Sequence, residues 1–196
     1  MKGKVSIILG IGVFLLGVSP GLFAKPRTTS GPKPSVTGTI LGEPFGAPFA
    51  RLKKMQPAEA KLSGKVTDRA QSYEIAFHVE NEFVPDNEIS IWFNLEVNQP
   101  IEGLNLNWKA TKFGTEEHRL QSFPVKRPAS VGRGITTVFV RREVRGKSKM
   151  ESYSDQISAT IKLGNIKNGR IPGKIVLRLP GRDGAIQGSF LAQVTK

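Results

Sequence analysis

Cysteine is absent from the 196-residue chain, and histidine occurs only twice, as His78 and His118. Without thiols the chain has no cysteine nucleophile and no disulfide framework, so its fold must depend on a hydrophobic core. Two histidines are too few for an imidazole-rich metal site. The sequence also has no Gly-rich phosphate loop before a helix and no Gly-x-Ser-x-Gly elbow. We therefore expect a protein that is not an enzyme and that uses no cofactor.

The N-terminus has the parts of a secretory signal. A short basic start precedes an apolar run, residues 5–18 (VSIILGIGVFLLGV), which is too short to span a bilayer comfortably. Leu22 and Ala24 then occupy the −3 and −1 positions of a cleavage site. We expect residues 1–24 to be a signal peptide and the mature chain to begin at Lys25.

Other absences bear on the destination of the chain. No cysteine follows the apolar run, which excludes a lipid-anchored lipoprotein. The sequence has no second hydrophobic segment, so we expect no membrane span once the signal is removed. The absence of an Asn-x-Ser/Thr sequence fits a bacterial envelope. We expect an exported protein, periplasmic or extracellular, and an uncleaved N-terminal anchor is the alternative.

Residues 25–60 contain six prolines, a composition that argues against a regular core element. A small tandem repeat, Gly-x-Pro-Phe, ends once in Phe45 and once in Phe49. These phenylalanines either dock on the chain's own domain or form a linear motif for a partner. We expect residues 25–60 to be an arm or linker, and residues 61–196 to fold without it.

From residue 61 onward, apolar and polar residues alternate with the period of a strand that has one buried face. The clearest runs are YEIAFHVENEF (73–83), SIWFNLEV (90–97), LNLNWKA (104–110), ITTVFVRREV (135–144), QISATIKL (156–163), KIVLRL (174–179) and AIQGSFLAQV (185–194). Seven to nine short strands without a convincing helix predict an all-β, antiparallel two-sheet β-sandwich, immunoglobulin-like or similar.

Trp92 lies in the polar phase of the run 90–97, where a large apolar side chain is unexpected. A symmetric turn between this run and the preceding one places Glu80 opposite Trp92 and His78 opposite Asn94. An aromatic ring flanked by such polar groups is typical of a sugar-binding face. Trp92, His78, Glu80 and Asn94 are thus a candidate carbohydrate site, unless the proline-rich arm or a neighbouring strand covers Trp92.

His78, Glu80 and Glu82 share one face of the predicted strand at two-residue intervals. Imidazole and carboxylate ligands so spaced can chelate a divalent ion, so a metal or small-ligand site is a further alternative. Acidic residues on the outer face of a strand are also ordinary solubilising residues.

Positive charge is concentrated in the C-terminal half of the chain. The net charge is +13, yet residues 61–102 hold three Lys/Arg against eight Asp/Glu, and residues 103–196 hold eighteen against six. The densest basic stretch predicts an anion-binding site on Lys126, Arg127, Arg133, Arg145, Lys147 and Lys149. Few aromatic residues lie nearby, which argues against specific nucleic-acid binding, and a solvated hairpin tip is the competing interpretation.

Together these patterns predict a secreted, non-catalytic binding or structural module associated with the cell envelope. Its expected partner is an anionic envelope polymer, bound weakly, or another envelope protein. A carbohydrate-binding module that uses Trp92 is the first alternative, and a periplasmic metal or small-ligand protein is the second.

Export should remove residues 1–24. We expect mass spectrometry of the exported protein to give a mature chain that begins at Lys25, because Ala24 ends a signal of ordinary length and pattern. A soluble exported chain that still carries Met1 would contradict this prediction.

Overall fold

The computed structural model describes residues 36–82, 85–109, 131–144, 146–181 and 184–195. All regular structure in these ranges is β-strand, which confirms the all-β class. The strands are β1 (Val36–Ile40), β2 (Glu43–Ala47), β3 (Phe49–Lys54), β4 (Ala58–Leu62), β5 (Lys65–His78), β6 (Glu88–Leu95), β7 (Asn105–Lys109), β8 (Gly134–Val144), β9 (Lys147–Tyr153), β10 (Ser158–Leu163), β11 (Arg170–Arg178) and β12 (Gly184–Thr195). A helix with the length and apolarity to cross a membrane is not found in these ranges.

The strands belong to one mixed sheet, with the order β7-β10-β11-β12-β3-β5-β6-β8-β9. β1 joins this path by pairing with β12, β2 pairs with β1, and β4 pairs with β5. The pairing of β12 with β3 is parallel, and the other pairings of named strands are antiparallel. The expected immunoglobulin-like sandwich of two antiparallel sheets and seven to nine strands is therefore not confirmed.

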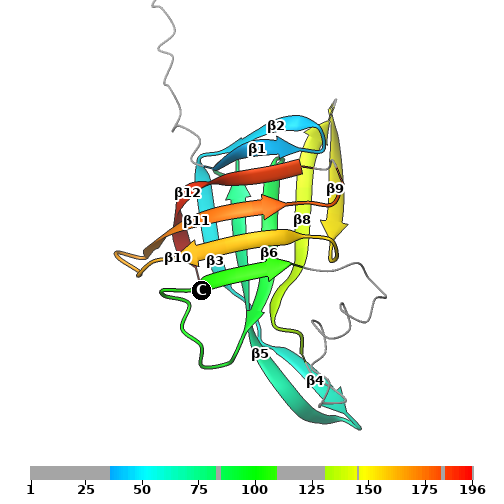
Figure 1. The fold of residues 1–196 in the computed structure, drawn as a ribbon, viewed down its shortest axis with the longest axis vertical. Coiled ribbons are helices and arrows are strands. Elements are labelled where there is room, and N and C mark those ends of the chain that lie inside the picture. Colours follow the sequence, from blue (N-terminus) through cyan, green and yellow to red (C-terminus); the bar gives the residue numbers. More distant parts are fainter. Residues whose placement is uncertain (1–35, 83–84, 110–130, 145, 182–183, 196) are drawn as a thin grey trace, which may run out of the picture. The chain divides into compact units, whose positions relative to one another are not determined.

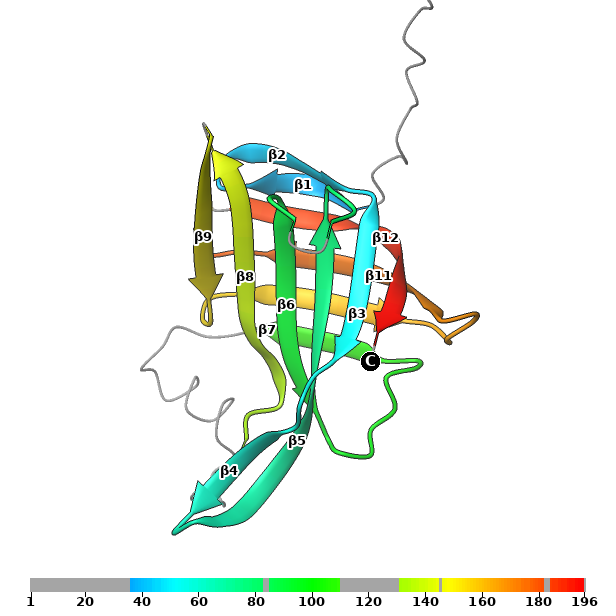
Figure 2. The same cartoon turned by 180° about the vertical axis from the view of Figure 1, so that it is seen from behind.

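β12 connects two layers of this sheet because its two halves pair with different strands. Residues 184–188 pair with β1, whereas residues 192–195 pair with β3. β11, β10 and β7 continue one layer, and β5, β6, β8 and β9 continue the other; the strands of the two layers cross at a steep angle (Figures 1 and 2). In such orthogonal packing a bent strand forms the corner. Gly188, with a φ of 155°, precedes the residues that pair with β3 and permits the bend.

The core lies between the two layers, where inward side chains are large and apolar. Phe77 of β5 and Phe190 of β12 meet edge to face, with ring centroids 5.0 Å apart. Full burial of one such side chain contributes about 1.5–3 kcal/mol. The inward phase predicted for β5 and β6 is confirmed by the burial of Tyr73, Ile75, Phe77, Ile91, Phe93 and Leu95. Val79 and Val97, which share that phase, lie past the strand ends and are exposed.

Residues 36–60, the described part of the proline-rich segment, contribute strands to the sheet, so the expectation that residues 25–60 hold no regular element was wrong. They contain β1, β2, β3 and part of β4, and β3 lies between β12 and β5. Pro44 lies in β2, which pairs only with β1, and Pro48 and Pro57 lie between strands. Prolines are tolerated at these positions because no ladder hydrogen bond is lost there.

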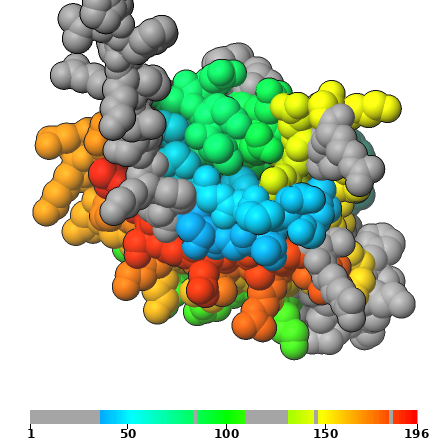
Figure 3. All heavy atoms as spheres, turned by 90° about the horizontal axis from the view of Figure 1, so that it is seen from above, coloured from blue at the N-terminus to red at the C-terminus, as the bar shows by residue number. Residues whose placement is uncertain are grey.

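Of the two alternatives for the repeated phenylalanines, docking on the chain's own domain is confirmed. Phe45 is 4% exposed and belongs to the core, and Phe49 stacks on His78 with ring centroids 5.7 Å apart. Seen from above, the atoms of β1 and β2 (blue to cyan) lie between those of β12 (red) and the residues that connect β5 with β6 (green) (Figure 3). The β1–β2 hairpin therefore covers one end of the core.

If β3 is a core strand, Leu52→Ala should lower the free energy of unfolding by about 2–5 kcal/mol, because Leu52 is 1% exposed. Leu62→Ala is the matched control. Leu62 is 51% exposed on β4, and its removal should change the free energy by no more than about 0.5 kcal/mol. Chemical denaturation of both variants measures the difference. Equal, small effects would mean that residues 25–60 are a dispensable arm.

Candidate functional site

Trp92 lies on the outer face of β6, but its neighbours differ from those predicted. Glu74, rather than Glu80, lies opposite Trp92, and His78 lies opposite Glu88. The predicted register of the β5–β6 hairpin was therefore wrong.

The physical reason is a longer connection, residues 79–87, in place of the expected five-residue turn. The Val79 amide donates to the Asn87 carbonyl oxygen over 3.1 Å. The Glu80 carboxylate accepts hydrogen bonds from the Asn87 backbone amide at 3.2 Å and from its side chain at 2.8 Å. Glu80 thus closes the connection and is not part of a face around Trp92.

The Trp92 ring packs against the neighbouring strand and leaves part of its surface exposed. Its indole N–H donates to Glu74 Oε1 over 3.3 Å, and Phe139 of β8 meets the ring edge to face at 5.1 Å. The side chain is 39% exposed. Phe49 of the proline-rich segment stacks on His78, so this phenylalanine is not the residue that covers Trp92.

The other residues of the predicted carbohydrate site have structural partners. His78 is buried, and its Nδ1 lies 2.6 Å from the Glu80 carbonyl oxygen. Asn94 is also buried; it accepts a hydrogen bond from the Ser72 hydroxyl at 2.7 Å and donates to the Gly132 carbonyl oxygen at 3.0 Å.

The alternative metal site on His78, Glu80 and Glu82 is likewise not assembled. Within the described residues, no group of three histidine, aspartate or glutamate side chains is placed to hold a metal ion.

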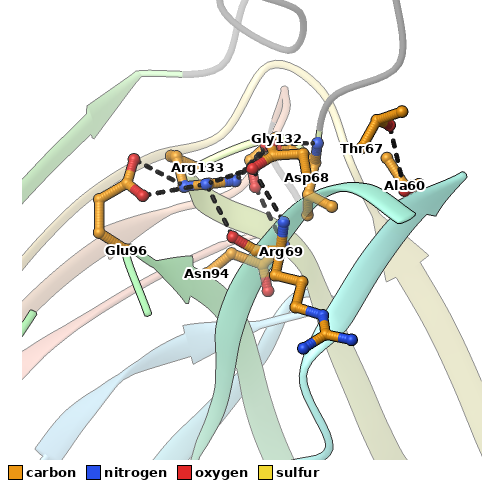
Figure 4. A network of polar contacts seen from close by, with 9 residues as sticks. Ala60, Thr67, Asp68, Arg69, Asn94, Glu96, Gly132 and Arg133 are labelled. Atoms are coloured by element: carbon orange, nitrogen blue, oxygen red, sulfur yellow. Dashed lines mark hydrogen bonds and ion pairs between the residues drawn. The ribbon is translucent and has the colours of Figure 1, made fainter. Parts of the chain in front are cut away.

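Arg133, predicted to bind anions, lies between two carboxylates (Figure 4). Its Nη2 is 3.0 Å from Asp68 Oδ1, and its Nε is 2.9 Å from Glu96 Oε1. Its Nη1 and Nη2 also donate to the backbone oxygens of Val131 and Arg69. Its charge is thus already compensated. Arg133, which directly precedes β8, links Asp68 of β5 to Glu96, which directly follows β6.

The pKa values in this network shift in the direction that keeps both partners charged. The Arg133 hydrogen bond, followed by that of the Val131 amide, holds the pKa of Asp68 below its ordinary value. Hydrogen bonds to Glu96 and then to Asp68 raise the pKa of Arg133.

The remaining predicted anion-binding residues are only partly brought together. Lys147 and Lys149 are exposed on β9, not in a loop, and Lys149 Nζ lies 3.0 Å from Glu151 Oε1. Lys126, Arg127 and Arg145 lie outside the described residues.

A larger basic surface, which the sequence analysis missed, covers the outer face of β7, β10, β11 and β12. The strand pairings place five exposed cations on it: Lys109, Lys162, Arg170, Lys174 and Arg178. The described strand residues that point outward here include no Asp or Glu, and the structure gives none of the five cations an ion pair with a described residue. We call this surface the basic face.

Two cations of the basic face lie directly opposite each other. Lys162 of β10 pairs with Lys174 of β11, on strands about 4.8 Å apart. Like charges in a cross-strand pair are destabilising. Along β11, Arg170, Lys174 and Arg178 follow one another at four-residue intervals, about 13 Å each.

Small polar side chains lie between these cations. Asn107, Ser158 and Thr160 line a depression of about 230 Å³ together with Lys109 and Val176. The Thr160 hydroxyl donates to Asn107 Oδ1 over 3.0 Å. The basic face therefore combines uncompensated positive charge with groups that can donate and accept hydrogen bonds.

A larger cleft, of about 520 Å³, lies beside the basic face where β3 runs along β12. Its lining includes Arg170 of β11, Gln193 of β12, Arg51 and Phe49 of β3, and Glu82 from the connection that follows β5. Arg51 is paired with Glu88 at 3.7 Å. The cleft adjoins the basic face at Arg170, but its lining holds a carboxylate, Glu82, as well as cations.

No family model, curated protein or solved structure matches this chain. Function is therefore inferred from the residues themselves. The signal for the basic face was present in RIPGKIVLR (170–178), in which Arg170, Lys174 and Arg178 share the outward phase. Lys109 and Lys162 join them only through strand pairing.

The Arg133 network should contribute to stability in a pH-dependent way. Asp68→Asn should lower the free energy of unfolding at neutral pH by about 1 kcal/mol, the scale of a partly exposed, hydrogen-bonded ion pair. Since the folded-state pKa of Asp68 is lowered, the wild-type advantage should be complete above the unfolded pKa, near 4. It should disappear as the pH falls through the lower, folded-state pKa.

Denaturation of both proteins across this pH range measures the effect. Glu59→Gln is the control, because Glu59 pairs with Arg69 on the surface and should matter little at any pH. A deficit of Asp68→Asn that is the same at every pH would show that charge is not its cause.

Proposed function

We propose that this protein is a non-catalytic binding module that attaches to an anionic polymer of the cell envelope through its basic face. The observation that carries the proposal is the directly opposed pair Lys162 and Lys174, on a face without a described outward acidic residue. An opposed pair of like charges reduces fold stability, and a bound anion would relieve the repulsion. The N-terminal pattern, read as an export signal, supports the envelope as the place of action.

The chemistry of the basic face favours an acidic polysaccharide over a nucleic acid. Sequence-tolerant binding of single-stranded nucleic acid relies on aromatic platforms. The described outward residues of this face include no aromatic side chain. Trp108, which also lines the depression, lies in the inward phase of β7 and packs against the core. Hydroxyl and amide groups, such as those of Thr160, Ser158 and Asn107, can instead hydrogen-bond sugar hydroxyls. Carboxylate or phosphate groups on the same polymer would pair with the cations.

Carbohydrate binding through Trp92 is a second candidate. One observation favours it: the ring is 39% exposed and is oriented by Glu74 and Phe139. Such a site would bind through stacking on a sugar ring, so its affinity should depend little on salt.

Charge reversal at Lys162 separates the proposal from misfolding. Lys162→Glu should pair with Lys174 across the strands and keep or raise the melting temperature. The same change replaces one of the five cations of the basic face, Lys162, and neutralises a second, Lys174, by pairing with it. We expect affinity for an acidic polysaccharide to fall about tenfold at low salt, which corresponds to the loss of two exposed ion pairs. Sedimentation with the polysaccharide, or with isolated envelopes, measures binding.

Two variants complete the comparison. Lys147→Glu makes the same change in net charge on β9 and should reduce affinity much less, while Trp92→Ala should leave it unchanged. Wild-type binding should weaken steeply as salt rises. Equal losses in Lys147→Glu and Lys162→Glu would contradict a specific role for the basic face, and loss only in Trp92→Ala would favour the second candidate.

A further inference from the structure

A second cleft, of about 580 Å³, opens at the end of the core where β3 and β12 terminate. Its apolar lining comes from Leu52, Met55, Pro57, Ile101, Ile166 and Val194. A volume in this range, with mostly apolar walls and a few polar groups, is typical of a small-molecule site. The cleft is separate from the basic face. It is lined by inward-phase residues of β3 and β5, whereas the basic face consists of outward residues of β7, β10, β11 and β12.

Lys54 supplies a positive charge at the mouth of this cleft. It lies opposite Tyr73, in the same inward phase as Leu52, and is exposed. No ion pair joins Lys54 to a described residue. A lysine at an inward position can keep its ammonium group in water while its stem covers apolar surface, so its charge is available to a ligand whose chain enters the cleft.

Two further side chains define the wall beside Lys54. Tyr73 is 9% exposed and stacks on Phe93 with ring centroids 5.6 Å apart. Burial raises the pKa of Tyr73, so its phenol stays protonated and can donate a hydrogen bond. The side-chain amide of Gln71 donates to the backbone oxygens of Met55 and Ser72, at 2.8 and 3.0 Å, and holds this wall in place.

We propose that this cleft binds an amphipathic anion, a single acyl chain that ends in a carboxylate. The chain would lie against Leu52, Ile101 and Val194, and the carboxylate would pair with Lys54 at the mouth. This inference does not depend on the polymer-binding proposal, since it concerns a different surface and a different ligand.

Dodecanoate and the uncharged dodecanol are suitable probes, each used below its aggregation concentration. Both should displace a neutral fluorescent dye, Nile red, from the full mature protein in a saturable way. Lys54→Met should weaken dodecanoate binding about three- to fivefold, the scale of one partly exposed ion pair, and leave dodecanol binding unchanged.

Lys53→Met is the matched control, because Lys53 precedes Lys54 in β3 and lies in the outward phase, opposite Glu74. It should change neither affinity. Ile166→Trp should weaken both ligands at least tenfold by filling the cleft, and the fold should tolerate it because Ile166 is 36% exposed.

The proposal is overturned by any of three results: no saturable displacement by dodecanoate, equal effects of Lys53→Met and Lys54→Met, or unchanged affinity in Ile166→Trp. Lys162→Glu should leave both affinities intact, so a failure here is distinguishable from failure of the polymer-binding proposal.

Discussion

The parallel pairing of β12 with β3 is the constraint on which the rest of the structure depends. β12 begins in one layer, beside β1 and β11, and ends in the other, beside β3. One continuous, open sheet thereby folds over its own core, and Phe77 and Phe190 meet between the layers. Because this pairing joins residues 50–53 to residues 192–195, the described part of the proline-rich segment is an integral part of the fold.

Once the sheet is folded in this way, strand alternation decides which side chains face solvent. Each layer has a single outer face, so a two-residue period in the sequence becomes a two-dimensional array of outward side chains. On one layer that array holds five cations. On the other, Glu74 lies opposite Lys53 and Glu88 lies opposite Arg141, so both signs of charge are present. The two outer faces therefore differ in charge pattern: one has cations without a described outward carboxylate, and the other has cations directly opposite carboxylates.

Polar side chains that stabilise the fold differ from the candidate binding residues in whether they have hydrogen-bond or ion-pair partners among the described residues. Arg133 is held by Asp68 and Glu96, and Glu80 is held by Asn87. Residues whose hydrogen bonds and charges are satisfied within the fold have little left to offer a ligand. By contrast, the structure gives Lys162, Lys174 and Lys54 no ion pair with a described residue, and each stands where a bound anion would compensate it.

The sequence by itself determined the all-β class, the inward phase of β5 and β6, and the concentration of positive charge in the C-terminal half, because alternation and composition are local properties. It did not determine the register of β5 against β6, since hydrogen bonds between Glu80 and Asn87 lengthen the connection. Nor could it show that Lys109 and Lys162 lie beside the β11 cations, or that β3 lies between β12 and β5. Only the tertiary structure decided these neighbours, because pairing between distant strands depends on how the whole sheet buries its apolar face.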